Sequence, residues 1–115
     1  MVDKDKIIAA VNVLLEALGE DPAREGLVET PKRVSEMYSE LFSGILEDPS
    51  EVLNISFDEE HNGLVTLQDL PFSSMCEHHL LPFIGTATIS YLPNGRILGA
   101  SKLGRALDIL SKRPQ

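Results

Sequence analysis

The chain has 115 residues, which fits one small domain and is too short for two ordinary hydrophobic cores. Its net charge of −8 argues against a general nucleic-acid binder, because such proteins present a basic face to phosphates. Charges interrupt the amphipathic N-terminal stretch and no later apolar run reaches bilayer length, so we expect neither a secretion signal nor contact with a membrane.

Cysteine usage and the distribution of charge refine these limits. Cys76 is the only cysteine, which rules out an intrachain disulfide and favours the reducing cytoplasm. Most acidic residues lie in residues 1–60. The last twenty residues instead carry five basic side chains, so an anionic small molecule could bind there: Arg96, Lys102, Arg105, Lys112 and Arg113.

Two helices are predicted in the first part of the chain. Apolar residues recur at helical spacing over residues 7–18, and Gly19 follows them as a C-cap. Thr30 is expected to cap a second helix with Pro31 at its first position, and an apolar stripe follows over residues 34–42. Both stripes are typical of core packing.

The periodicity changes after residue 63. Residues 48–63 read as a polar connection that touches a strand only briefly, and residues 64–67 as a short strand. Residues 83–92 alternate apolar and polar side chains, as a half-buried strand does. Because Pro93-Asn94-Gly95 is a turn signal, residues 96–99 are expected to return antiparallel to that strand.

A third helix is predicted near the end, with Ser101 as its N-cap. Lys112 and Arg113 are expected to be solvated. The sequence therefore predicts an α+β fold, with a helical region and linker over residues 1–60 and a second region over residues 61–115. The buried stripe of the third helix is expected to comprise Leu103, Ala106, Leu107 and Leu110.

The segment SSMCEHHLLPF, residues 73–83, carries the chemistry. Cys76 and His79 have the Cys-x-x-His spacing with which a tight turn can present two ligands to one zinc ion. Two ligands do not complete a site, and His61 lies on a polar stretch with no evident reason to converge. The alternative is a buried Cys76 beside ordinary polar histidines.

Two segments resemble the GTP cyclohydrolase I family, namely residues 72–115 and the segment GLVETPKRVSEMY, residues 26–38. The resemblance implies that Cys76 and His79 are two of three protein ligands to a catalytic zinc. It also implies that His78 transfers protons at the purine ring. No catalytic role is expected for Glu77.

The same resemblance gives the basic residues a role. Ser101, Lys102 and Arg105 match residues that contact the GTP triphosphate, as does Arg33 on the second helix. A helix N-terminus with adjacent cations suits an anion. From the residues alone, Lys102 and Arg105 could equally form a solvated helix face.

The family fold is a T-fold, an antiparallel sheet with helices on one face, whose subunits form ring-shaped homo-oligomers with active sites at the interfaces. We expect this chain to hold the N-terminal helices and the first half of the T-fold, an antiparallel hairpin plus a helix, without the C-terminal part. In the family the third zinc ligand is a cysteine beyond the Arg-Pro-Gln segment. The 115 residues alone are therefore expected to be inactive.

Three interpretations follow. The first is a partial sequence of a GTP cyclohydrolase I, which converts GTP and water to formate and 7,8-dihydroneopterin triphosphate at the start of tetrahydrofolate or pterin synthesis. The second is a short binding or interaction module of the same fold without activity. The third is an unrelated small structural-zinc or helical interaction domain.

Overall fold

The structure, a computed structural model, describes residues 1–54 and 56–115. The chain forms two compact units, residues 1–43 and 44–115, and each is described by itself. The first holds α1 (Lys4–Ala17) and α2 (Thr30–Leu41), which pack on each other. None of the described helices has the length and apolar character needed to cross a bilayer.

The end of α1 is set by Gly19, as predicted. Gly19 has φ +85°, a conformation that costs little only for glycine. Its amide donates to the Glu16 carbonyl at 2.9 Å, and the next amide, of Glu20, donates to the Leu15 carbonyl at 3.0 Å. These two bonds satisfy carbonyls that the helix leaves free.

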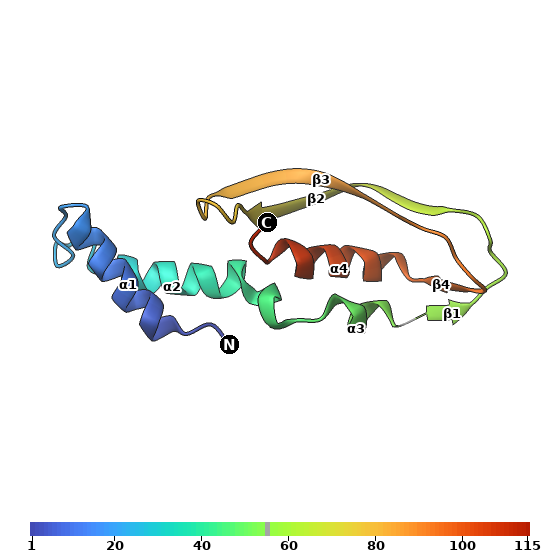
Figure 1. Cartoon of the computed structure of the whole chain (residues 1–115), viewed down its shortest axis with the longest axis horizontal. Coiled ribbons are helices and arrows are strands. Elements are labelled where there is room, and N and C mark those ends of the chain that lie inside the picture. The colour runs from blue at the N-terminus through green and yellow to red at the C-terminus, as the bar shows by residue number, and fades with distance from the viewer. Residues whose placement is uncertain (55) are drawn as a thin grey trace. The chain divides into compact units, whose positions relative to one another are not determined.

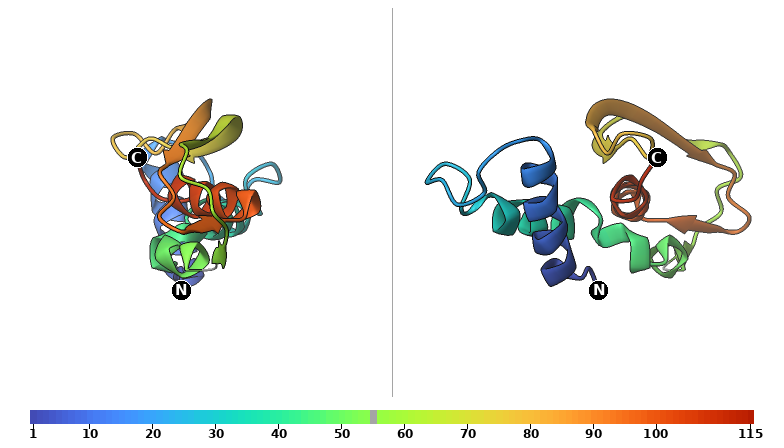
Figure 2. Two further views of the ribbon diagram at one scale, coloured as in Figure 1. Left: turned by 90° about the vertical axis from the view of Figure 1, so that its right-hand side faces the viewer. Right: turned by 60° about the vertical axis from the view of Figure 1, so that its left-hand side comes forward.

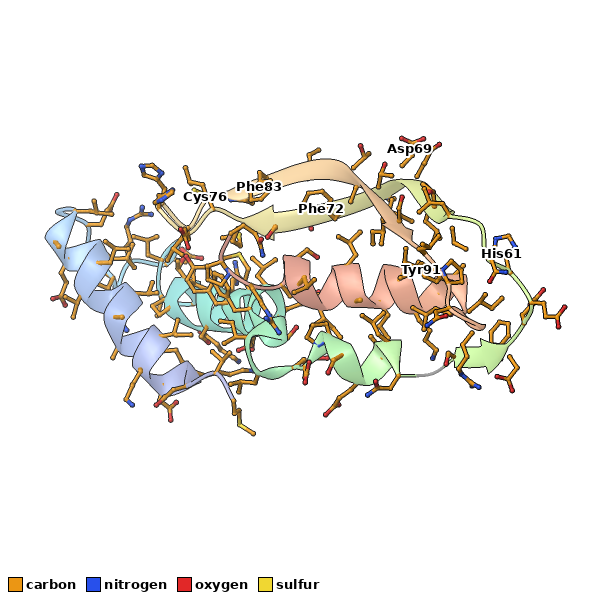
Figure 3. The ribbon with its side chains drawn as sticks, turned by 45° about the vertical axis from the view of Figure 1, so that its right-hand side comes forward. His61, Asp69, Phe72, Cys76, Phe83 and Tyr91 are labelled. Carbon is orange, nitrogen blue, oxygen red and sulfur yellow. The ribbon has the colours of Figure 1, made fainter. Side chains whose placement is uncertain are left out.

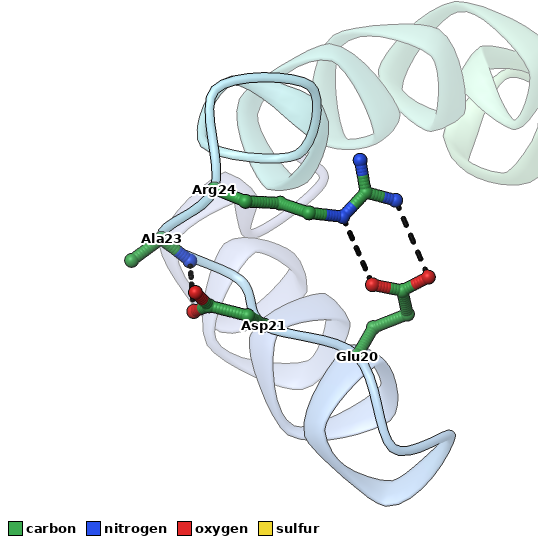
Figure 4. Close-up of polar contacts among 4 residues, drawn as sticks. All are labelled: Glu20, Asp21, Ala23 and Arg24. Carbon is green, nitrogen blue, oxygen red and sulfur yellow. Dashed lines mark hydrogen bonds and ion pairs between the residues drawn. The ribbon is translucent and has the colours of Figure 1, made fainter.

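The connection between α1 and α2 is stabilised locally (Figure 4). The Arg24 guanidinium donates to both carboxylate oxygens of Glu20, at 2.9 and 3.3 Å, and Asp21 accepts from the amide of Ala23 at 2.9 Å. The bonds and charge of Arg24 lower the pKa of Glu20. Because the pair is exposed, its contribution to stability is small.

The start of α2 differs from the prediction by one residue. Thr30 is the first helical residue and Glu29 occupies the cap position, without a side-chain capping bond. Pro31 is tolerated because the first-turn amides of a helix have no intrahelical partner. Pro31 and Ser35 are the buried residues of α2.

The second unit begins at Gly44, inside the 3-10 turn η1 (Ser43–Leu46), and continues with α3 (Pro49–Leu53) and β1 (Ser56–Asp58). The brief strand in this connection was predicted, whereas the helix was not. Asp48 caps α3 by accepting from the Ser50 amide at 2.9 Å. The sequence did not predict this short helix because the segment is polar and Asp48-Pro49 is typical of a turn as well as of a helix start.

The pairing of β4 (Arg96–Leu98) corrects the predicted hairpin. β4 pairs antiparallel with β1 and not with the preceding strand. The Arg96 guanidinium donates to Ser56 and Asp58 across this pair. The Tyr91 hydroxyl accepts from the Leu98 amide at 2.9 Å, so a side chain, not a backbone ladder, connects β4 to the strand before it.

The main hairpin consists of β2 (Val65–Met75) and β3 (Pro82–Tyr91), which pair antiparallel. β2 extends well beyond the short strand predicted at residues 64–67. Its register shifts between Leu67 and Leu70, where Asp69 has φ +57°. This irregularity bends the strand and interrupts the alternation from which a sequence pattern is read. β3 begins and ends one residue before the predicted range of 83–92, and its two faces alternate as predicted.

α4 (Ala100–Ser111) lies between the hairpin and α3 (Figure 1), and Figure 2 shows the curved hairpin on one side of it. Ile109 is buried and Leu110 is 43% exposed, contrary to the predicted stripe. The α+β class is confirmed, and the division at residue 60 stays a prediction. The buried apolar side chains join the end of β2 to α4: Met75, Leu103, Ala106 and Ile109.

Candidate functional site

Residues 76–81 form the loop between β2 and β3, so the chemically distinctive segment is a hairpin connection. The Cys76 amide donates to the Leu81 carbonyl and the Leu80 amide to the Cys76 carbonyl, each at 2.8 Å. Leu80 has φ +54°, which closes the turn. Cys76 and His79 are thereby held in one tight turn.

The two histidines of this loop are oriented differently. The ring centroids of His78 and His79 lie 6.5 Å apart and the ring planes meet at 70°. His78 Nε2 lies 3.7 Å from Glu77 Oε1, and both side chains are exposed. The arrangement suits separate roles for the two imidazoles.

The start of the loop is also bound from outside. The Gln115 amide donates to the Met75 carbonyl at 2.9 Å, and the Glu77 amide donates to the Gln115 carbonyl at 2.7 Å. Pro114 forms a parallel bridge with Met75. These contacts flank Cys76 on both sides, so its backbone position depends on the segment that follows α4.

The donor chemistry of the loop suits zinc in part, because a thiol and an imidazole are two of its usual ligands. Within residues 1–54 and 56–115, no three Cys, His, Asp or Glu side chains gather closely enough to hold a metal ion. Figure 3 shows His61 at the opposite end of the hairpin from Cys76. The described residues thus present two candidate ligands, Cys76 and His79, and no third beside them.

The N-terminus of α4 carries the second group of predicted residues. Gly99 occupies the cap position, which corrects the assignment of Ser101 as N-cap. Ser101 and Arg105 are exposed and Lys102 is half-buried. Among the described residues, neither Lys102 nor Arg105 has an ion-pair partner. Their charges remain available to an anion.

These two groups lie at opposite ends of α4. The loop adjoins Gln115, just beyond the C-terminal end of the helix, while residues 101–105 form its first turns (Figure 1). We call residues 101–105 the basic turn. A helix of 12 residues is about 18 Å long. A single copy of the unit therefore does not bring the loop and the basic turn together.

Two further arginines, Arg33 and Arg113, lie outside both groups. Arg33 is exposed on α2, in the first unit. Arg113, predicted to be solvated, is half-buried and donates to the Gly44 carbonyl at 2.8 Å and to the Glu47 carbonyl. No local sequence signal announces this, because both acceptors are backbone groups far away in the chain.

Comparison with known proteins places these segments in a family. A family model described as GTP cyclohydrolase I matches residues 7–115. The chain belongs to the GTP cyclohydrolase I family. GTP cyclohydrolase 1 of Caldanaerobacter subterraneus subsp. tengcongensis is 58% identical over 116 residues, which cover 100% of this chain and 62% of that protein.

Other members of the GTP cyclohydrolase I family agree. The Clostridioides difficile protein is 59% identical over 116 residues, and the Listeria welshimeri protein is 57% identical over 115 residues. Each match covers 99% of this chain and 61% of the relative. The resemblance found in the sequence is confirmed. The chain spans about three fifths of the length of these relatives, which fits the predicted first half of a T-fold.

Proposed function

We propose that this chain provides two parts of the active site of a GTP cyclohydrolase I. One is the metal loop, residues 76–81, and the other is the basic turn, residues 101–105, which binds the triphosphate. The reaction converts GTP and water to formate and 7,8-dihydroneopterin triphosphate, at the start of tetrahydrofolate or pterin synthesis in the cytoplasm. Family membership over residues 7–115 supports the activity. The single observation that carries the site is the closed turn that holds Cys76 and His79 together.

In this proposal Cys76 and His79 supply two zinc ligands, and a third comes from outside the 115 residues. Zinc held by these residues would supply a water molecule acidic enough to act as a nucleophile at neutral pH, which ring opening at C8 of guanine requires. His78 is exposed on the same turn and faces differently from His79, which supports a role in moving protons at the purine. Glu77 Oε1 lies 3.7 Å from His78 Nε2, beyond hydrogen-bond distance, and no catalytic role is proposed for it.

The first turn of α4 is proposed to bind the triphosphate. Ser101 offers a hydroxyl at a helix N-terminus, where backbone amides favour an anion, and Lys102 and Arg105 add positive charge. Arg33 on α2 is proposed to contribute from the first unit. The net charge of −8 makes this basic turn the exception in an otherwise acidic chain.

Assembly into a homo-oligomeric ring is part of the proposal. The separation of loop and basic turn along α4 supports a site shared between copies, in which the loop of one subunit meets the basic turn of another. Leu81, the last residue of the loop, and Ile84, in the first part of β3, are 63% and 86% exposed. Exposed apolar side chains on a two-stranded hairpin favour association.

The test is an assay of the complete gene product with zinc and GTP. We expect formate release and a pterin that fluoresces after oxidation, with ATP giving neither. Cys76→Ala is expected to abolish turnover, whereas His61→Ala, at the other end of the hairpin, is the matched control and retains it. A metal-loaded protein that binds GTP without releasing formate would favour a binding module over the enzyme.

A further inference from the structure

The loop that contains Cys76 depends on the short segment after α4. Backbone bonds from Met75 and Glu77 both reach Gln115, at 2.9 and 2.7 Å. Cys76 lies between these two bonded residues, so its backbone has little freedom to shift unless Gln115 shifts too. The position of Cys76 is therefore only as well defined as that of residues 113–115.

Residues 113–115 are in turn held by several side chains. Ser74 donates to the Arg113 carbonyl at 3.3 Å, and Gln115 Nε2 donates to the Leu110 carbonyl at 2.7 Å. Arg113 makes the contacts that reach the start of the unit. The Arg113 guanidinium donates from Nε to the Gly44 carbonyl at 2.8 Å and from Nη2 to the Glu47 carbonyl. A planar fork can serve two carbonyls at once, which a lysine ammonium on a flexible stem does less well. Arg113 thus anchors the segment to η1.

The acceptor itself has little room to move. Gly44 is buried, and a Cβ at this position would lie 2.0 Å from the Ile109 carbonyl oxygen of α4. The close contact fixes the η1 backbone against the helix. The guanidinium therefore binds a part of the fold that cannot easily yield.

We infer that Arg113 is a positioning residue for the Cys76–His79 loop, acting through Gln115. This inference rests on the proposed role of the loop in metal binding. Arg113 touches neither ligand, and its effect passes through the backbone bonds of Gln115 to Met75 and Glu77. Loss of the guanidinium should release the segment first and loosen the loop second.

Hydrogen exchange of the complete gene product, prepared without metal, tests the backbone step. Arg113→Ala should speed exchange in peptides containing the Glu77 amide about tenfold, the factor that corresponds to losing a hydrogen bond to a charged group. Arg113→Lys should give a smaller increase. Lys112→Ala is the matched control, because Lys112 pairs with Asp108 and does not touch the loop. Lys112→Ala should leave the exchange rate of the same peptides unchanged.

Cobalt substitution tests the link to metal binding. The thiolate-to-cobalt absorption band should weaken and shift in Arg113→Ala, recover partly in Arg113→Lys, and match wild type in Lys112→Ala. Unchanged exchange, or unchanged cobalt affinity and spectrum, in Arg113→Ala would overturn the inference. Failure of wild type and Lys112→Ala to bind cobalt would instead overturn the proposed metal loop, so the two failures are distinguishable.

Discussion

The hydroxyl of Ser74 donates a hydrogen bond of 2.6 Å to the carbonyl of Ser111, where both residues are buried. The acceptor belongs to the last turn of α4, whose carbonyls have no intrahelical partner. The Ser74 hydroxyl also lies 3.3 Å from the Arg113 carbonyl, so it connects the end of β2, just before the Cys76–His79 loop, to the end of the helix.

Removing this hydroxyl should be costly. Ser74→Ala leaves the buried Ser111 carbonyl without its closest partner and should lower the free energy of unfolding by about 1–3 kcal/mol. Ser73→Ala, at an exposed position of the same strand, should change it by less than about 0.5 kcal/mol. Urea unfolding of both variants measures the difference. Equal stabilities would contradict the assigned bond.

Two glycines should respond to alanine in opposite directions. Gly44→Ala forces a methyl group against the Ile109 carbonyl, and overpacking of this kind costs about 1–3 kcal/mol. Gly104 lies inside α4 with open space around it. Gly104→Ala should therefore raise the free energy of unfolding by up to about 1 kcal/mol, because alanine has the higher helix propensity. Thermal melting should therefore show a lower Tm for the first and a higher Tm for the second. A shift of the same sign in both would count against this packing.

The elements that the sequence predicted well are those set by local chemistry. Gly19 ends α1 because only glycine adopts its backbone conformation without strain, and the residues of β3 alternate because one face is covered. The partner of β4 could not be predicted in the same way. Its choice of β1 depends on bonds from Arg96 to Ser56 and Asp58, about forty residues away.

In the candidate site, too, local features were predictable from the sequence and tertiary contacts were not. Cys76 and His79 share a turn, so their proximity follows from spacing alone. The dependence of that turn on Gln115 and Arg113 is a tertiary relationship, and a basic residue after a helix reads as solvated until its acceptors are seen. Family resemblance assigned roles to single residues, but it did not predict their separation along α4.

Stability should depend on pH through the cap of α3. The hydrogen bonds from Ser50, with a smaller effect of the Arg113 charge, hold the pKa of Asp48 below its ordinary value of 3.8. A lowered folded-state pKa means that the cap contributes fully above pH 3.8 and loses its contribution as the pH falls through the folded value.

The variant Asp48→Asn isolates this effect, because asparagine can cap the helix but does not titrate. The difference in unfolding free energy between wild type and Asp48→Asn should be constant near neutral pH and shrink below about pH 4. Because Asp48 is exposed, the change should be small. Urea unfolding from pH 2.5 to 7 measures it, and a difference that grows on acidification would reverse the assigned sign.

His78 and His79 should not be interchangeable in the complete gene product. Their rings are 6.5 Å apart and steeply inclined, so one ion is not expected to be bound by both. His79→Ala should lose most of the zinc, whereas His78→Ala should keep it and lose turnover by about a hundredfold or more, as for a proton-transfer residue. Metal analysis and formate release decide this. Equal zinc loss in both variants would refute the separate roles.

The Cys76–His79 loop and the basic turn are proposed to be halves of one site, contributed by different copies of the chain. Cys76→Ala and the double variant Lys102→Ala/Arg105→Ala should each be inactive in the complete gene product. When the two are co-expressed with different tags and purified as mixed oligomers, a shared site requires an intact loop from one copy and an intact turn from another. Formate release from GTP should then recover to roughly a quarter of wild type, the statistical share of intact pairs. Mixed oligomers that form and yet release no formate would contradict the claim.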